Sequence, residues 1–172
     1  MTLSTIGVVI DIPEPHSAVL TGWRRRAGDP QAEKIWPHVT LLPPTLITTS
    51  DMEKVEDHLA AAASAFAPFA MHLAGTGTFR PVSPVVFIQI ARGLSECELL
   101  EKAIRCGPLS RDLDFPYHPH VTVAQDVEEE SLDRVYDGLS DFIARFVISQ
   151  FTLFERGPEG GWVQRRHFAL GG

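Results

Sequence analysis

One tetrapeptide occurs twice in this chain of 172 residues, and it constrains the fold more than any other feature. Pro37-His38-Val39-Thr40 and Pro119-His120-Val121-Thr122 lie 82 positions apart, so each half of the chain carries one copy. A random chain of this composition would hold roughly 0.003 copies, which makes chance a poor explanation. We therefore expect the two copies to occupy structurally related positions in one fold.

Both copies have the composition of a β-strand. Valine and threonine follow the proline, and an apolar residue comes next, Leu41 in the first copy and Val123 in the second. Residues two apart in a strand share a face. His38 and Thr40 are therefore expected on one face of the first strand, and His120 and Thr122 on one face of the second.

An imidazole beside a hydroxyl, present twice, is suited to the chemistry of phosphate esters. Opening a cyclic phosphate needs a base to activate water and an acid to protonate the leaving oxygen. Histidine, with an ordinary pKa near 6.5, can serve as either near neutral pH. The two threonine hydroxyls can donate hydrogen bonds to the non-bridging phosphate oxygens. This chemistry requires no metal or other cofactor.

With two His-apolar-Thr-apolar motifs, one in each half of a small chain, the sequence resembles the 2H phosphoesterase superfamily. That superfamily includes 2′-5′ RNA ligase-like proteins and cyclic nucleotide phosphodiesterases. The resemblance implies a two-lobed α+β fold with a central cleft. It also implies that His38 and His120 are the catalytic pair and that Thr40 and Thr122 bind the phosphate. The expected activity is that of a 2′,3′-cyclic phosphodiesterase or 2′-5′ RNA ligase-like hydrolase, with a role in RNA processing.

The order of predicted elements agrees with an α+β class. A helix and two strands follow His38, and a helix and two strands follow His120, which indicates an internal duplication about a pseudo-two-fold axis. Antiparallel sheets flanked by helices are expected. The predicted strands lie at about 3–12, 36–42, 69–78, 84–91, 119–125, 146–155 and 162–170, and the helices at about 13–26, 49–66, 95–106 and 129–144.

The length suits a single domain over residues 1–172. We expect a first lobe over about 30–92 and a second over about 108–172. Residues 1–29 and 93–107 are then expected to pack against the two lobes.

Further candidates lie outside the repeat. Arg80, at the tip of a predicted hairpin, could grip a phosphate with two hydrogen bonds, although a solvated surface arginine is the commoner case. Tyr117, Phe79 or Trp162 could stack on a base, although packing in the core or at its rim is the commoner role for such residues.

Two alternatives to catalysis by the histidine pair remain open at this point. His118 stands two residues before His120, so these two residues and His38 together have the ligand types of a zinc site. The first copy of the motif has Trp36 at the equivalent position, so the repeat itself gives no reason for His118. The same cleft could also bind a nucleotide or RNA end without converting it.

Charge and hydropathy limit the partners. The net charge of −7 disfavours binding along an extended nucleic acid, but not binding of a small cyclic-phosphate nucleotide or a short RNA end. No apolar run is long enough to cross a bilayer, and residues 1–5 lack the pattern of a secretory signal. We expect a cytoplasmic monomer with no membrane partner.

Overall fold

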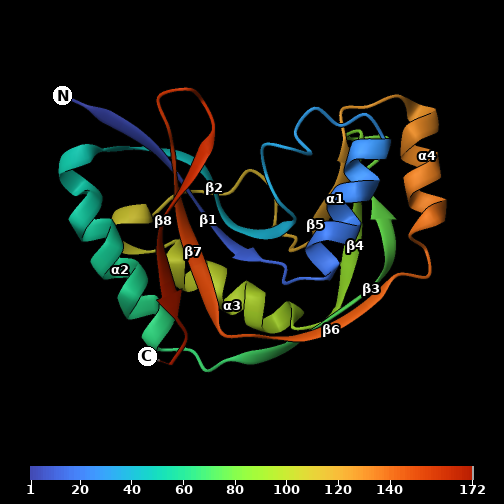
Figure 1. The fold of residues 1–172 in the computed structure, drawn as a ribbon. Coiled ribbons are helices and arrows are strands. Elements are labelled where there is room, and N and C mark those ends of the chain that lie inside the picture. The colour runs from blue at the N-terminus through green and yellow to red at the C-terminus, as the bar shows by residue number, and fades with distance from the viewer. Residues whose placement is uncertain (172) are drawn as a thin grey trace.

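The computed structural model describes residues 1–171, and its strands form one continuous antiparallel sheet in the order β6-β3-β4-β5-β2-β1-β7-β8 (Figure 1). The two strands that carry the motifs, β2 and β5, are neighbours at its centre. The strands are β1 (Leu3–Asp11), β2 (His38–Thr48), β3 (Phe69–Thr78), β4 (Val85–Arg92), β5 (Val121–Gln125), β6 (Ile143–Ile148), β7 (Gln150–Arg156) and β8 (Trp162–Ala169). The α+β class predicted from the sequence is confirmed.

The helices divide into two pairs, one for each half of the sheet (Figure 1). α1 (His16–Arg26) and α4 (Glu129–Gly138) pack on the half that contains β3, β4 and β5. α2 (Met52–Ser64) and α3 (Leu94–Ile104) pack together on the half that contains β2 and β8. Within residues 1–171, none of the helices has both the length and the apolar character needed to span a membrane.

The strand order fits a duplicated unit. β1-α1-β2-α2-β3 in the first part of the chain corresponds to β4-α3-β5-α4-β7 in the second, and each pair of equivalent strands lies at the same distance from the β2–β5 junction. β6 and β8 are the two edge strands. A pseudo-two-fold axis through the junction therefore relates the two motif strands.

The halves of the sheet do not coincide with the expected lobe ranges of 30–92 and 108–172. β2 pairs with β1, which lies before the first range, and β1 pairs with β7 from the second. β3 and β4 join the half that contains β5 instead. The two halves are interleaved because β3 of the first part pairs with β4 of the second, and β7 of the second part pairs with β1 of the first.

The first motif strand is longer than predicted, since β2 continues through Pro43 and Pro44 to Thr48. The pairing of β2 with β1 shifts register between Ile6 and Val8, opposite the two prolines. An irregular ladder tolerates residues that lack an N–H donor. The prolines therefore mark a bulge and not the end of the strand.

Two boundaries near the C-terminus also differ from prediction. α4 ends at Gly138 and not near residue 144, and a Cβ atom at Gly138 would lie 2.2 Å from the ring of Trp23. The single strand predicted at 146–155 is split at Ser149 into β6 and β7. β6 pairs with β3 and β7 with β1, so the chain passes from one half of the sheet to the other at that residue.

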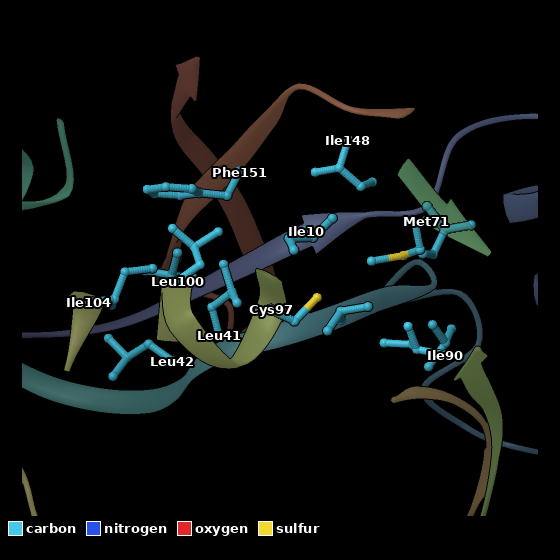
Figure 2. Packing of buried hydrophobic residues seen from close by; sticks show 14 of the residues in the cluster. Ile10, Leu41, Leu42, Met71, Ile90, Cys97, Leu100, Ile104, Ile148 and Phe151 are labelled. Carbon is cyan, nitrogen blue, oxygen red and sulfur yellow. The ribbon is translucent and has the colours of Figure 1, made fainter. Parts of the chain in front are cut away.

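The hydrophobic core fixes which face of the motif strands is free. Val39 and Val121 are fully buried, and Leu41 and Val123 are buried with them. Figure 2 shows Cys97, Leu100 and Ile104 of α3 close to Leu41 and Leu42 of β2. Because side chains alternate along a strand, the motif histidines and threonines point away from this core.

Candidate active site

The register between the two central strands brings the four motif residues together. Val39 faces Val121 across the antiparallel β2–β5 pair, which sets His38 opposite Thr122 and Thr40 opposite His120. Facing residues on one side of an antiparallel pair have Cβ atoms about 5 Å apart, and diagonal neighbours are about 7–8 Å apart. Both His-Thr pairs predicted from the sequence therefore lie in one compact group at the centre of the sheet.

The two imidazoles are held in the same way. Nδ1 of His38 lies 2.7 Å from the carbonyl oxygen of Trp36, and Nδ1 of His120 lies 2.6 Å from that of His118. A carbonyl oxygen can only accept a hydrogen bond, so Nδ1 must carry the proton in each neutral ring. Nε2 is consequently the atom that exchanges protons in both residues.

Burial lowers the pKa of both histidines below the ordinary value. The pKa of His38 is depressed mainly by desolvation, with smaller contributions from the charges of Arg24 and His120. The carbonyl of Trp36 and the carboxylate of Asp11 oppose this depression. Burial also lowers the pKa of His120, and the charge of nearby His118 adds to the effect. A bound phosphate anion would favour the charged form of either ring and raise its pKa.

Two cavities flank the motif residues and share Thr40, Leu42 and Pro43 in their walls. His38 lines the smaller cavity, which has a volume of about 80 Å³ and includes the aromatic rings of Trp36, Phe154 and Trp162. His120 lines the larger cavity, of about 610 Å³, which is in the size range of small-molecule sites. Thr122 faces His38 across the strand pair but does not line either cavity.

Neighbouring aromatic side chains hold His120 and Thr40 in place. The ring of His120 packs against Phe79, with centroids 4.9 Å apart, and against Phe87, with centroids 5.2 Å apart. Tyr117 lines the same cavity, and its hydroxyl donates a hydrogen bond of 2.6 Å to the carbonyl oxygen of Thr40. Tyr117 thus fixes the backbone of the first motif, while its ring remains on the cavity wall.

Arg80 is not brought to the cavities. Its guanidinium donates to the carboxylate of Asp133 at 2.7 Å and to the hydroxyl of Thr78 at 3.1 Å. These contacts direct it toward α4, and it lines neither cavity. Of the other stacking candidates, Phe79 lies in the wall of the larger cavity and Trp162 in that of the smaller one.

The described part of the chain contains no ligand cluster of the kind that the zinc alternative requires. The rings of His118 and His120 have centroids 5.8 Å apart. Among residues 1–171, however, no three His, Cys, Asp or Glu side chains gather in a way that could hold a metal ion. The histidines of the two motifs are instead engaged with backbone carbonyls through Nδ1.

Several cavity residues were not foreseen from the sequence. Arg111, Leu113 and Phe115 all line the larger cavity, whereas Asp112 and Asp114 between them are exposed. The alternation in Arg-Asp-Leu-Asp-Phe was a detectable signal of an extended segment with one face on a site. Trp36 joins the smaller cavity through its place two residues before His38, where its indole N–H donates to Asp11.

Comparison with known proteins identifies the family of the chain. A sequence model of the 2′-5′ RNA ligase superfamily matches residues 12–159, which include both motifs. The chain belongs to the 2′-5′ RNA ligase superfamily. Membership of this superfamily, together with relatives named as phosphoesterases, supports a phosphoesterase activity.

Similar proteins and solved structures align over nearly the whole chain. A Bacillus cereus protein with the name "Putative phosphoesterase" is 27% identical over 168 residues, which cover 96% of each chain. The structure of Escherichia coli LigT complexed with 3′-AMP aligns with a TM-score of 0.74 and 17% identity, covering 98% of this chain and 99% of LigT. TT0787 of Thermus thermophilus aligns with a TM-score of 0.63 and 22% identity, covering 98% of each chain. The LigT-like fold of the chain is thereby established.

Proposed function

We propose that the protein is a metal-independent phosphoesterase that hydrolyses, or reversibly ligates, 2′,3′-cyclic phosphate or 2′-5′ phosphodiester bonds by general acid/base catalysis with His38 and His120. One observation carries the proposal. His38 is the first residue of β2, and His120 directly precedes β5. The β2–β5 register sets the two histidines diagonally on one face, and both have Nδ1 bonded to the carbonyl two residues earlier. This arrangement leaves two Nε2 atoms for a single phosphate bound between the strands.

In hydrolysis, Nε2 of the neutral histidine removes a proton from water as the water oxygen bonds to phosphorus. Nε2–H of the protonated histidine then gives its proton to the ester oxygen as the bond from phosphorus to that oxygen breaks. The hydroxyls of Thr40 and Thr122 donate to the non-bridging oxygens and stabilise the charge that develops there. In the ligating direction the two histidines exchange roles.

The proposed substrate is a small nucleotide or a short RNA end, bound by a cytoplasmic monomer. The net charge of −7 favours a small ligand over extended nucleic acid. The structures of LigT with 3′-AMP and with phosphate show that a protein of this fold binds such ligands.

The test is turnover of the four nucleoside 2′,3′-cyclic monophosphates in excess EDTA, with the 2′- and 3′-monophosphate products resolved. His38→Ala and His120→Ala should each lower kcat by a factor of about 10²–10⁴ while the circular dichroism spectrum stays unchanged. His16→Ala, at the start of α1, is the matched control and should retain activity. Near-normal kcat in either motif variant would contradict the two-histidine mechanism.

A binding module is the second candidate, and one observation favours it. Burial lowers the pKa of both His38 and His120, so neither ring is a ready acid at neutral pH. Stabilisation by cyclic nucleotides or 2′-5′ linked oligonucleotides in a thermal-shift assay, with no product formed, would support binding alone. Product formation would support the enzyme.

A further inference from the structure

The two cavities beside the motif residues differ in charge. Apart from His38, the residues that line the smaller cavity are uncharged, and most are apolar or aromatic. The larger cavity contains two arginines, Arg105 and Arg111, and one carboxylate, Glu101. An additional phosphate on a substrate would therefore meet a cation only in the larger cavity.

Arg105 and Arg111 are not equivalent within that cavity. Arg105 donates to the carboxylate of Glu101 at 2.7 Å, so the charge of this arginine is balanced inside the cavity wall. Arg111 is half-buried, and its neighbours Asp112 and Asp114 are exposed and do not line the cavity. The positive charge of Arg111 is consequently the one directed at a ligand.

The mouth of the larger cavity is apolar. Phe115 is 77% exposed and Val82 is 87% exposed, and both line this cavity. Phe115 follows Arg111 by four residues, whereas Val82 comes from the connection between β3 and β4. An exposed aromatic ring and an arginine that line one cavity are suited to a nucleotide, since the ring stacks on a base and the guanidinium binds a phosphate with two hydrogen bonds.

We propose, on the basis of the proposed function, that Arg111 binds a second phosphate of the substrate while the adjoining base packs against Phe115. The preferred substrate is then a 2′,3′-cyclic phosphate that carries an additional phosphate group. That group is either a 5′-phosphate on the same nucleoside or the internucleotide phosphate of an RNA end. Both sources present the same anion to Arg111.

Three substrates separate these sources: adenosine 2′,3′-cyclic phosphate, its 5′-phosphorylated form, and the dinucleotide ApA ending in a 2′,3′-cyclic phosphate. The wild-type kcat/KM should be about tenfold higher for at least one of the two phosphate-bearing substrates, as expected for a charge-assisted contact. The favoured one identifies the source of the phosphate. Arg111→Ala should remove that preference, and Arg111→Lys should retain part of it. Arg92→Ala, which removes an exposed arginine on β4 outside both cavities, should leave the preference intact.

A binding measurement separates failure of this inference from failure of the proposed function. Calorimetry should show about tenfold tighter binding of adenosine 3′,5′-bisphosphate than of adenosine 3′-monophosphate, and Arg111→Ala should abolish the difference. Equal kcat/KM for all three substrates, or equal affinity for the bisphosphate and the monophosphate, would overturn the role of Arg111 while leaving the histidine mechanism standing. Absence of turnover with the affinity difference intact would overturn the enzyme but support the phosphate site.

Discussion

Substitution of Asp29 by Asn should destabilise the protein markedly, because Asp29 neutralises a buried arginine. Arg24 donates to Oδ2 of Asp29 through Nε at 2.9 Å and Nη2 at 2.7 Å. The side chains are only 3% and 1% exposed, and Oδ1 accepts the backbone N–H of Gln31 at 2.9 Å. The pair thus holds the turn after α1, which leads into the first motif.

The size of the effect follows from this burial. Removing one partner of a buried ion pair costs about 3–5 kcal/mol, because the remaining charge is left uncompensated. An asparagine can still accept one hydrogen bond from Arg24, so we expect a loss of about 3 kcal/mol. For a chain of this size that corresponds to a decrease in Tm of about 6–12 °C.

Urea unfolding followed by circular dichroism measures the loss directly. Asp29→Asn should lower the midpoint with little change in the m-value. Replacing both partners, as in Arg24→Met with Asp29→Leu, should recover most of the stability, since well-packed apolar residues often substitute for a buried pair. Glu33→Gln is the control: it removes the carboxylate of the exposed pair with Arg25 and should leave Tm unchanged. An Asp29→Asn variant as stable as the wild type would refute the argument from burial.

Two further predictions concern the cleft. Burial lowers the pKa of both His38 and His120 below 6.5, and catalysis needs one ring neutral and the other protonated. A plot of kcat/KM against pH should therefore be bell-shaped, with its maximum below pH 6.5. A maximum above pH 7 would contradict this prediction. Tyr117→Phe removes the hydrogen bond to the carbonyl of Thr40 and should cost about 1 kcal/mol, or about 2–4 °C in Tm, together with a decrease in kcat. Thermal denaturation and steady-state kinetics would check this prediction, and an unchanged Tm and kcat would count against a positioning role.

The local features of the site could be predicted from the sequence because they depend on residues close together in the chain. The alternation of polar and apolar residues in each motif places His38 beside Thr40 and Val39 in the core, whatever strand lies next to them. The repeat then predicts two such strands. Their presence and their buried faces were accordingly predicted correctly.

The remaining features depend on contacts between distant residues. The pairing of β1 with β7 joins Ile6 to Glu155, and no local pattern in either strand specifies that partner. The break at Ser149 lies in a run without glycine or proline, so the interruption between β6 and β7 left no signal in composition. The position of the Arg80 side chain also depends on a distant residue, because Asp133 on α4 binds its guanidinium. The sequence around Arg80 does not indicate that partner.

The interleaving of the sheet has a consequence for how the protein is synthesised. The motif of β2 leaves the ribosome early, yet its neighbour β1 lacks its second partner until β7 has been translated. A nascent chain that stops before Gln150 already carries both histidines but exposes an unpaired edge of β1. Long-range pairing of this kind slows folding and leaves strand edges open to aggregation. Completion of the cleft therefore waits for the translation of β7, and a product shortened before Gln150 should be a target for chaperones and not a partly active enzyme.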